Sequence, residues 1–194
     1  MTLTAAILLA GARVPAFDDA VALLPFGDGT LVEYQVEQLR AAGVDVIEVV
    51  LGHEAERIIP LVGLDNVEPI VDARWDESAA SALRVGATAV PRETVRALIV
   101  SVAAPRTAAD YRRLLEAHRD GDAPVATLAG DDAPVAVSRA VLAEIRNLRD
   151  DAPGLGPIVE RHGLRAVPGG GAAISITSRE SYAAALRAFG FGLA

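Results

Sequence analysis

The chain has 194 residues, no cysteine and no lysine, so all 18 of its basic residues are arginines. The absence of cysteine excludes disulfides, thiolate nucleophiles and cysteine-ligated metal centres, and the absence of lysine excludes any step that needs a lysine ammonium. A formal net charge of −8 argues against a nucleic-acid-binding surface, because phosphate backbones are bound by Lys and Arg.

The apolar runs are all shorter than the roughly 18 residues that a membrane-spanning helix needs, so we expect no contact with a membrane. The first run has no basic region before it and stops at Gly11, which predicts a buried strand rather than a signal peptide. We therefore expect a cytoplasmic protein. A chain of this length commonly forms one domain, so residues 1–194 are expected to fold together.

Apolar, β-branched runs alternate along the chain with segments of helical period. Strands are expected at residues 5–10, 46–51, 67–71, 95–102, 125–128, 133–137, 164–167 and 173–176. Helices are expected at residues 30–42, 54–61, 77–89, 108–119, 139–147, 155–161 and 179–189. This alternation predicts a single-domain α/β fold: a three-layer α/β/α sandwich whose mainly parallel, Rossmann-like sheet has helices on both faces.

Helix-capping residues support these boundaries. Thr30 stands before the first helical segment with Glu33 three residues later, the spacing of a capping box. Gly43 is placed to end that helix. Thr107, with Asp110 early in the segment that follows, predicts another helix start.

In an open parallel sheet, ligands bind beyond the carboxyl ends of the strands, where the strand order reverses. For this chain the rule selects residues 11–21, 52–54 and 103–107. The first of these lies in the sequence Leu-Ala-Gly-Ala-Arg-Val-Pro-Ala-Phe-Asp-Asp-Ala-Val-Ala-Leu-Leu-Pro, from Leu9 to Pro25. It matches neither the G-x-G-x-x-G of dinucleotide sites nor the Gly-Lys-Ser/Thr of a P-loop.

The stretch from Leu9 to Pro25 resembles, position for position, the first loop of the MobA-like nucleotidyltransferases, which attach GMP or CMP to molybdopterin. In that family the loop has the pattern L-A-G-G-x-S-x-R-M-G-x-x-K-x-L-L-P. Later segments resemble the family in the same order, at residues 39–56, 75–84, 134–146 and 175–182. The resemblance implies the nucleotide-diphospho-sugar transferase, or glycosyltransferase-A, type of the α/β sandwich.

The resemblance also implies where a nucleotide would bind if binding were retained. The corresponding residues are Leu9, Ala10, Gly11, Ala12, Arg13, Gly52, His53, Ser81 and Arg106. His53 would then contact a base or ribose, although we expect it to have a structural role. Arg106 would hold an anion at a strand end, or else be a solvated arginine at the start of a helix.

Several positions depart from the family's chemistry. Ala16 and Val21 stand where the family's loop arginine and lysine hold phosphates. Ala103 and Thr177 stand where the family has the aspartates that bind Mg²⁺, and alanine offers no oxygen ligand to a hard cation. Because nucleotidyl transfer depends on positioning and electrostatic stabilisation, the catalytic motifs are expected to be degenerate.

We therefore expect a MobA-like fold without nucleotidyl transfer, which binds nucleotide weakly or not at all and needs no cofactor. Such a protein would act as a binding or assembly module. It would pair with a protein partner or a second copy of itself, in connection with molybdenum-cofactor enzymes.

Two alternatives stay open. In the first, the protein is an active enzyme that moves CMP or GMP from a nucleoside triphosphate to molybdopterin or a similar acceptor. Its Mg²⁺ would be held by Asp18, Asp19 or Asp72, and its phosphates by Arg13 and Arg106. In the second, the chain is a small-molecule sensor with an apolar pocket lined by Val14, Ala16, Phe17, Val21 and Ala103.

The remaining distinctive side chains are expected to be structural. The single tryptophan, Trp75, is expected to anchor packing, and Asp150 and Asp151 to form a polar loop. His118 and His162 are expected near helix ends, without a metal.

Overall fold

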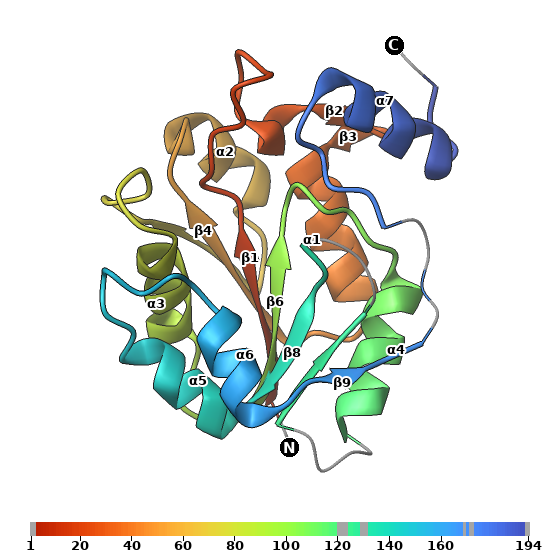
Figure 1. Ribbon diagram of the computed structural model, residues 1–194. Coiled ribbons are helices and arrows are strands. Elements are labelled where there is room, and N and C mark those ends of the chain that lie inside the picture. The colour runs from red at the N-terminus through yellow and green to blue at the C-terminus, as the bar shows by residue number, and fades with distance from the viewer. Residues whose placement is uncertain (1–2, 120–123, 129–131, 169, 171–172, 193–194) are drawn as a thin grey trace.

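The computed structural model describes residues 3–119, 124–128, 132–168, 170 and 173–192. Within these ranges one sheet has the strand order β5-β4-β1-β6-β8-β7-β9 (Figure 1). β8 is antiparallel to both of its neighbours, and every other neighbouring pair is parallel. The sheet strands are β1 (Leu3–Leu9), β4 (Val46–Leu51), β5 (Val67–Val71), β6 (Thr94–Ser101), β7 (Val125–Thr127), β8 (Val135–Ser138) and β9 (Arg165–Ala166).

Helices cover both faces of this sheet. On one face lie α1 (Leu31–Ala41), α2 (Ala55–Val62) and α4 (Ala108–Arg119), and on the other lie α3 (Ala79–Ala89), α5 (Arg139–Arg146) and α6 (Gly156–His162). The last helix, α7 (Arg179–Ala188), lies beside a small hairpin of β2 (Pro25–Phe26) and β3 (Gly29–Thr30), at the end of the molecule toward which β1 runs (Figure 1). The predicted three-layer α/β/α sandwich is therefore confirmed.

Most predicted elements are present, with ends shifted by one or two residues. The predicted capping box is formed, because the Thr30 side chain accepts from the Glu33 N–H and Glu33 accepts from the Thr30 N–H. Gly43 follows the end of α1 with φ of +87°, as expected of a helix-ending glycine. The hairpin and the 3₁₀ turn η1 (Val21–Leu23) are not among the predicted elements.

The strand predicted at residues 173–176 is wrong. Residues 173–177 carry no strand assignment, and Ile176 donates one backbone hydrogen bond to the Ala103 carbonyl at 2.7 Å. Ala103 already lies beyond Ser101, the last residue of β6, so there is no strand edge for a ladder to follow. The apolar run is thus joined to the end of the sheet by the Ile176–Ala103 hydrogen bond rather than by a strand ladder.

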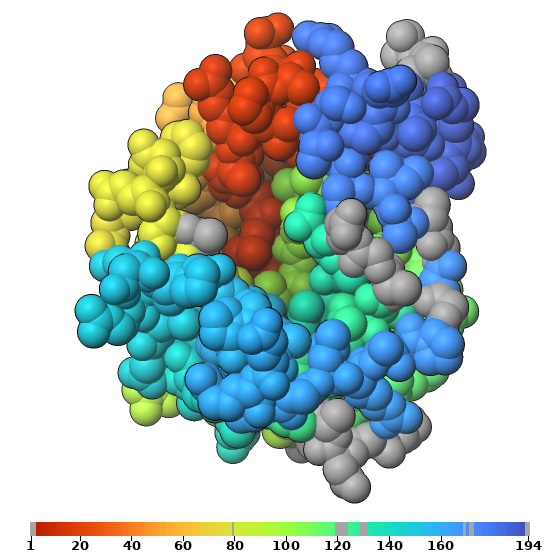
Figure 2. Space-filling view, viewed as in Figure 1, coloured from red at the N-terminus to blue at the C-terminus, as the bar shows by residue number. Residues whose placement is uncertain are grey.

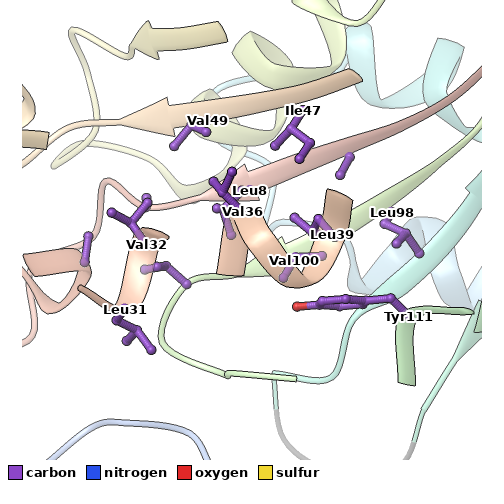
Figure 3. Packing of buried hydrophobic residues seen from close by; sticks show 14 of the residues in the cluster. Leu8, Leu31, Val32, Val36, Leu39, Ile47, Val49, Leu98, Val100 and Tyr111 are labelled. Carbon is purple, nitrogen blue, oxygen red and sulfur yellow. The ribbon is translucent and has the colours of Figure 1, made fainter. Parts of the chain in front are cut away.

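Each face of the sheet has its own apolar core. Figure 3 shows the larger one, in which Leu8, Val49 and Val100 from three adjacent strands pack against Val36 and Leu39 of α1. The second core lies between the other face and α3, α5 and α6. Strands covered on both sides are expected to be continuously apolar, as β1 is from Ala5 onward and as most of β4 is. Among the described helices, none is long and apolar enough to cross a bilayer.

Glu48 is the exception in β4. Glu48 is only 4% exposed. Its register partner on β5 is another acid, Glu68. Burial, and then the charge of Glu68, raise the pKa of Glu48 to about 6. A buried carboxylate that repels its neighbour destabilises the sheet at neutral pH.

Glu48→Gln is therefore expected to change how stability depends on pH. Because the folded-state pKa is raised, the native protein holds the proton more tightly than the unfolded chain, so wild-type stability falls as pH rises from about 4.5 to above 6. This shift in pKa corresponds to a loss of about 2 kcal/mol in the free energy of unfolding over that pH range. Urea unfolding of both proteins at pH 4.5 and 8 measures it.

The variant should gain about that amount relative to wild type on going to pH 8. Glu56→Gln, at an exposed position of α2, is the matched control and should follow the wild-type pH dependence. If the free energy of unfolding depended on pH in the same way for Glu48→Gln and wild type, burial would not raise the pKa of Glu48.

Candidate functional site

The segments selected from the sequence meet at the carboxyl ends of β1, β4 and β6. Ala10 donates a backbone hydrogen bond to Val50 at 2.8 Å, and His53 donates one to Gly11 at 3.0 Å. On the other side of β1, Val102 donates one to Leu9 at 2.9 Å. The sheet thus brings the three loops together, as the strand-end rule predicts.

Gly11 and Gly52 pack against each other at this junction. A Cβ atom on Gly11 would lie 2.7 Å from the Gly52 nitrogen. One on Gly52 would lie 2.4 Å from Cβ and Cγ of Trp75 and 2.8 Å from the Gly11 oxygen. Both glycines are therefore required by the close approach of two backbones and an indole, independently of any ligand.

The second half of the first loop is held by the protein's own charges. Glu54, in a left-handed conformation with φ of 55°, accepts the Ala20 N–H at 2.5 Å. Arg57 bonds to Glu54 and also to Asp19, at 2.6 Å from Oδ1. The Ala20 N–H, and then Arg57, hold the pKa of Glu54 below its usual range. The Glu54 carboxylate thus accepts the Ala20 N–H, a backbone donor in the loop that resembles a phosphate-binding loop.

The positions aligned with the family's phosphate-holding cations belong to the core. Val21 is only 1% exposed and lies in the larger core with Phe17. Ala16, Val14 and Ala103 are partly buried and pack against that core. The apolar pocket predicted at these residues therefore stays a prediction: Phe17 and Val21 are buried in the core, whereas Val14, Ala16 and Ala103 are only partly buried against it.

The acidic residues of the loop lie on the surface. Asp19 pairs with Arg57, and Asp18 lies 3.8 Å from Arg179 of α7. Within the described ranges, no group of three or more His, Cys, Asp or Glu side chains is arranged to hold a metal. A site of one or two of these aspartates completed by substrate phosphates stays a prediction.

The two positions aligned with the family's metal carboxylates lie close together. The Ile176–Ala103 hydrogen bond places Thr177 directly beside the Ala103 segment, although the backbone there is not a strand. Thr177 is exposed, and its N–H donates to Ser181 Oγ at 3.0 Å. At this place the structure offers a methyl group and a neutral hydroxyl.

Arg106 is buried, which contradicts the solvated role considered for it. It is 1% exposed. Burial raises the pKa of the Tyr111 hydroxyl, and the positive charge of Arg106 offsets part of that rise. Arg106 is therefore not a solvated arginine at the start of α4, and its guanidinium is not displayed on the surface for an anion. Arg13, by contrast, is exposed on the first loop.

A cavity of about 490 Å³ opens at the ends of β1, β4, β5 and β6. Figure 2 shows the surface hollowed between the red N-terminal segment, the yellow segment that follows β5 and the cyan segment below it. We call this cavity the crevice. Of the predicted site residues, it is lined by Leu9, Gly11 and Ala12.

Ala10, Ser81 and His53 support the crevice from outside its lining. Ala10 and Ser81 are buried, and Ser81 Oγ donates to Asp72 Oδ1 at 2.8 Å. The His53 ring lies against Trp75, with the ring centroids 5.5 Å apart. Its expected structural role agrees with this packing.

A larger hollow of about 650 Å³ lies between α5 and α6. It has no residue from the ends of β1, β4 or β6 in its lining. Because ligands of such folds bind at the carboxyl ends of the strands, we place the functional site in the crevice.

Two contributors to the crevice were missed as binding residues. Asp72, after β5, and Trp75 both line it, whereas the sequence predicts Asp72 as a candidate metal ligand and Trp75 as a packing anchor. A rule that names loops after strands could have included the residue after β5. Nothing in the sequence indicates that Trp75 would lie over Gly52.

Asp150 is more than part of a polar loop. Arg74 donates to both of its carboxylate oxygens, at 2.7 and 2.8 Å, and Arg84 bonds to it as well. Ser78 donates to its backbone oxygen at 2.6 Å. Arg74 first, and then Arg84, hold the pKa of Asp150 below its usual range. This cluster fastens the segment after β5 to the loop after α5.

Comparison with known proteins supports the same architecture. A family model for the MobA-like NTP transferase domain matches residues 6–167. No curated protein matches the chain. Among solved structures, Rv0371c from Mycobacterium tuberculosis H37Rv is similar, with a TM-score of 0.81 and 23% identity over 96% of this chain and 98% of that one.

Two further structures extend the comparison. Rv0371c in complex with manganese has a TM-score of 0.77 and 25% identity over 96% of this chain and 98% of that one. A nucleotidyl transferase from Methanothermobacter thermautotroptrophicus, Mth528, has a TM-score of 0.80 and 20% identity, covering 96% of this chain and 97% of that one. These values show a shared fold along almost the whole length of each chain.

Proposed function

The chain belongs to the MobA-like NTP transferase domain family, and on this premise we propose that it is a member without nucleotidyl transfer that serves as a binding or assembly module. The partner would be another protein or a second copy of the chain, in connection with molybdenum-cofactor enzymes as the family resemblance suggests. The observation that carries the proposal lies in the first loop, where the Ala20 N–H is bound by Glu54 and Asp19 is bound by Arg57.

The chemistry of the loop supports this proposal. A triphosphate needs donors and cations, but the Ala20 N–H is taken by Glu54, and Arg57 is shared between Glu54 and Asp19. Val21, at the position of the family's lysine, is sealed in the core. Each lost charge contact to a transferring phosphate costs about 10²–10³ in rate, so the combined losses remove most of the acceleration that such a site could give.

The metal that the family reaction requires does not fit the residues present. Mg²⁺ is held by hard oxygen ligands, usually one or two carboxylates together with substrate phosphates. Beside the end of β6 this chain offers the Ala103 methyl group and the Thr177 hydroxyl. Rv0371c forms a manganese complex, so manganese belongs beside magnesium in any test of nucleotide transfer by this chain.

A pyrophosphate-release assay tests the proposal. Purified protein is incubated with ATP, CTP, GTP or UTP, with Mg²⁺ or Mn²⁺, and with a panel of pterin-phosphate and sugar-phosphate acceptors. We expect no release above the background without protein.

Asp72→Asn is the matched variant for this assay. Release by the wild type that is abolished in Asp72→Asn would overturn the proposal and establish the active alternative, with Asp72 in its site. Equal background rates for both proteins are the expected result.

A further inference from the structure

We propose that the crevice binds a small, flat organic cation, such as an amidine or a ring-bound amine, rather than a phosphorylated compound. The inference rests on the proposed function in one respect, namely that a metal–triphosphate complex is not the ligand. It is carried by an unpartnered buried acceptor, by the charge of the cavity lining and by an aromatic wall.

Asp72 supplies the acceptor. The residue is only 3% exposed and lines the crevice. Its Oδ1 accepts from the Arg74 N–H at 3.0 Å and from Ser81 Oγ at 2.8 Å. Its Oδ2 is buried and has no hydrogen-bond partner within the described structure. Because buried polar atoms are nearly always paired, an N–H donor of a ligand is the group that would complete this site.

The charge of the lining selects the sign of the ligand. Asp76, Glu77 and Asp132 line the crevice together with Asp72, and the described residues of its lining include no arginine or histidine. Two arginines adjoin lining residues in the sequence: Arg74, whose guanidinium is bound to both oxygens of Asp150, and Arg13, which is exposed on the first loop and is not part of the lining. A concave surface lined by one sign of charge attracts the opposite sign, so phosphate is disfavoured and a cation is favoured.

Trp75 supplies a wall for a flat ligand. Its ring is supported by His53, at 5.5 Å between ring centroids, and its Cβ and Cγ atoms are held over Gly52. Indole is the aromatic group that cations approach most favourably. The cavity volume, about 490 Å³, lies in the range of roughly 300–1,000 Å³ typical of small-molecule sites.

Three probes of one shape test the charge preference: benzamidine, a flat cation; benzamide, its neutral counterpart; and benzoate, an anion. Because Trp75 is the only tryptophan, its fluorescence, excited near 295 nm, reports directly on occupancy of the crevice. Calorimetry gives the affinity independently. We expect benzamidine to bind with one molecule per chain and to alter Trp75 emission, with benzamide and benzoate at least tenfold weaker.

Asp72→Asn keeps an oxygen for Ser81 and the Arg74 N–H while removing the charge, and we expect it to weaken benzamidine binding at least tenfold. The control is Asp151→Asn, which removes an exposed acid that pairs with Arg149 and lines the other hollow; it should leave binding unchanged. If Asp72→Asn does not fold, the comparison of the three probes on the wild type still decides.

The possible failures are distinguishable. Equal binding of benzamide and benzamidine, or no binding of benzamidine, overturns the cation inference and leaves the non-catalytic role standing. Displacement of benzamidine by CTP or GTP with Mg²⁺ at micromolar concentration overturns the proposed function itself.

Discussion

Gly52→Ala is expected to lower the free energy of unfolding by about 3 kcal/mol, the upper end of the usual cost of overpacking. The added methyl carbon would start 2.4 Å from the Trp75 side chain and 2.8 Å from the Gly11 oxygen. Neither neighbour can move freely. Gly11 accepts a hydrogen bond from the His53 N–H, and Trp75 packs on the His53 ring. Relief of the clash must therefore separate the ends of β1 and β4.

Urea unfolding monitored by circular dichroism measures this loss. Gly63→Ala is the matched control, since a Cβ there would meet only the Ile59 oxygen at 3.7 Å and the backbone φ of −75° suits alanine. The control should stay within about 0.5 kcal/mol of wild type. If Gly52→Ala were as stable as the control, the junction would not be close-packed.

Gln35→Leu is the second substitution with a large expected effect, about 3 kcal/mol or more from the loss of several buried hydrogen bonds. Gln35 is fully buried in α1. Its Nε2 donates to the carbonyls of Ser101 and Ala104, at 3.3 and 3.2 Å, and its Oε1 accepts from the Tyr111 hydroxyl at 2.7 Å. Leucine fills a similar volume but leaves these groups unpaired.

A double-mutant cycle with Tyr111→Phe separates the unpaired-hydroxyl cost from the packing cost. Tyr111→Phe alone should cost about 1 kcal/mol, and the double variant should be more stable than the sum of the single losses predicts, because no hydroxyl is then stranded. Strict additivity would show that the Gln35–Tyr111 bond contributes nothing. The cycle also probes the loop that carries Ala103, since Gln35 holds a carbonyl on each side of that residue.

The fold could be predicted in most of its parts because its local signals agree. The alternation of apolar strands and helices, the capping box at Thr30 and the end of α1 at Gly43 are properties of short sequence segments. The prediction failed where an element depends on what lies beside it. Residues 173–176 are apolar enough for a strand, but the sheet offers them no edge beyond the end of β6.

The candidate site could be predicted only in outline. Strand ends locate the crevice, and the adjacency of Ala103 and Thr177 follows from their aligned positions. Side-chain pairings across 66 and 76 residues, such as Arg84 and Arg74 with Asp150, leave no mark on the sequence. The burial of Arg106 was equally hidden, because an arginine at a helix start is ordinarily solvated.

Calorimetric titration of CTP and GTP into the wild-type protein, with Mg²⁺ and separately with Mn²⁺, tests the central claim most directly. With Glu54 closing the first loop and no carboxylate at Ala103, we expect only heats of dilution up to millimolar nucleotide, and no difference when the metal is omitted. Micromolar binding of either nucleotide that is strengthened by either metal would contradict the loss of the nucleotidyl-transfer site.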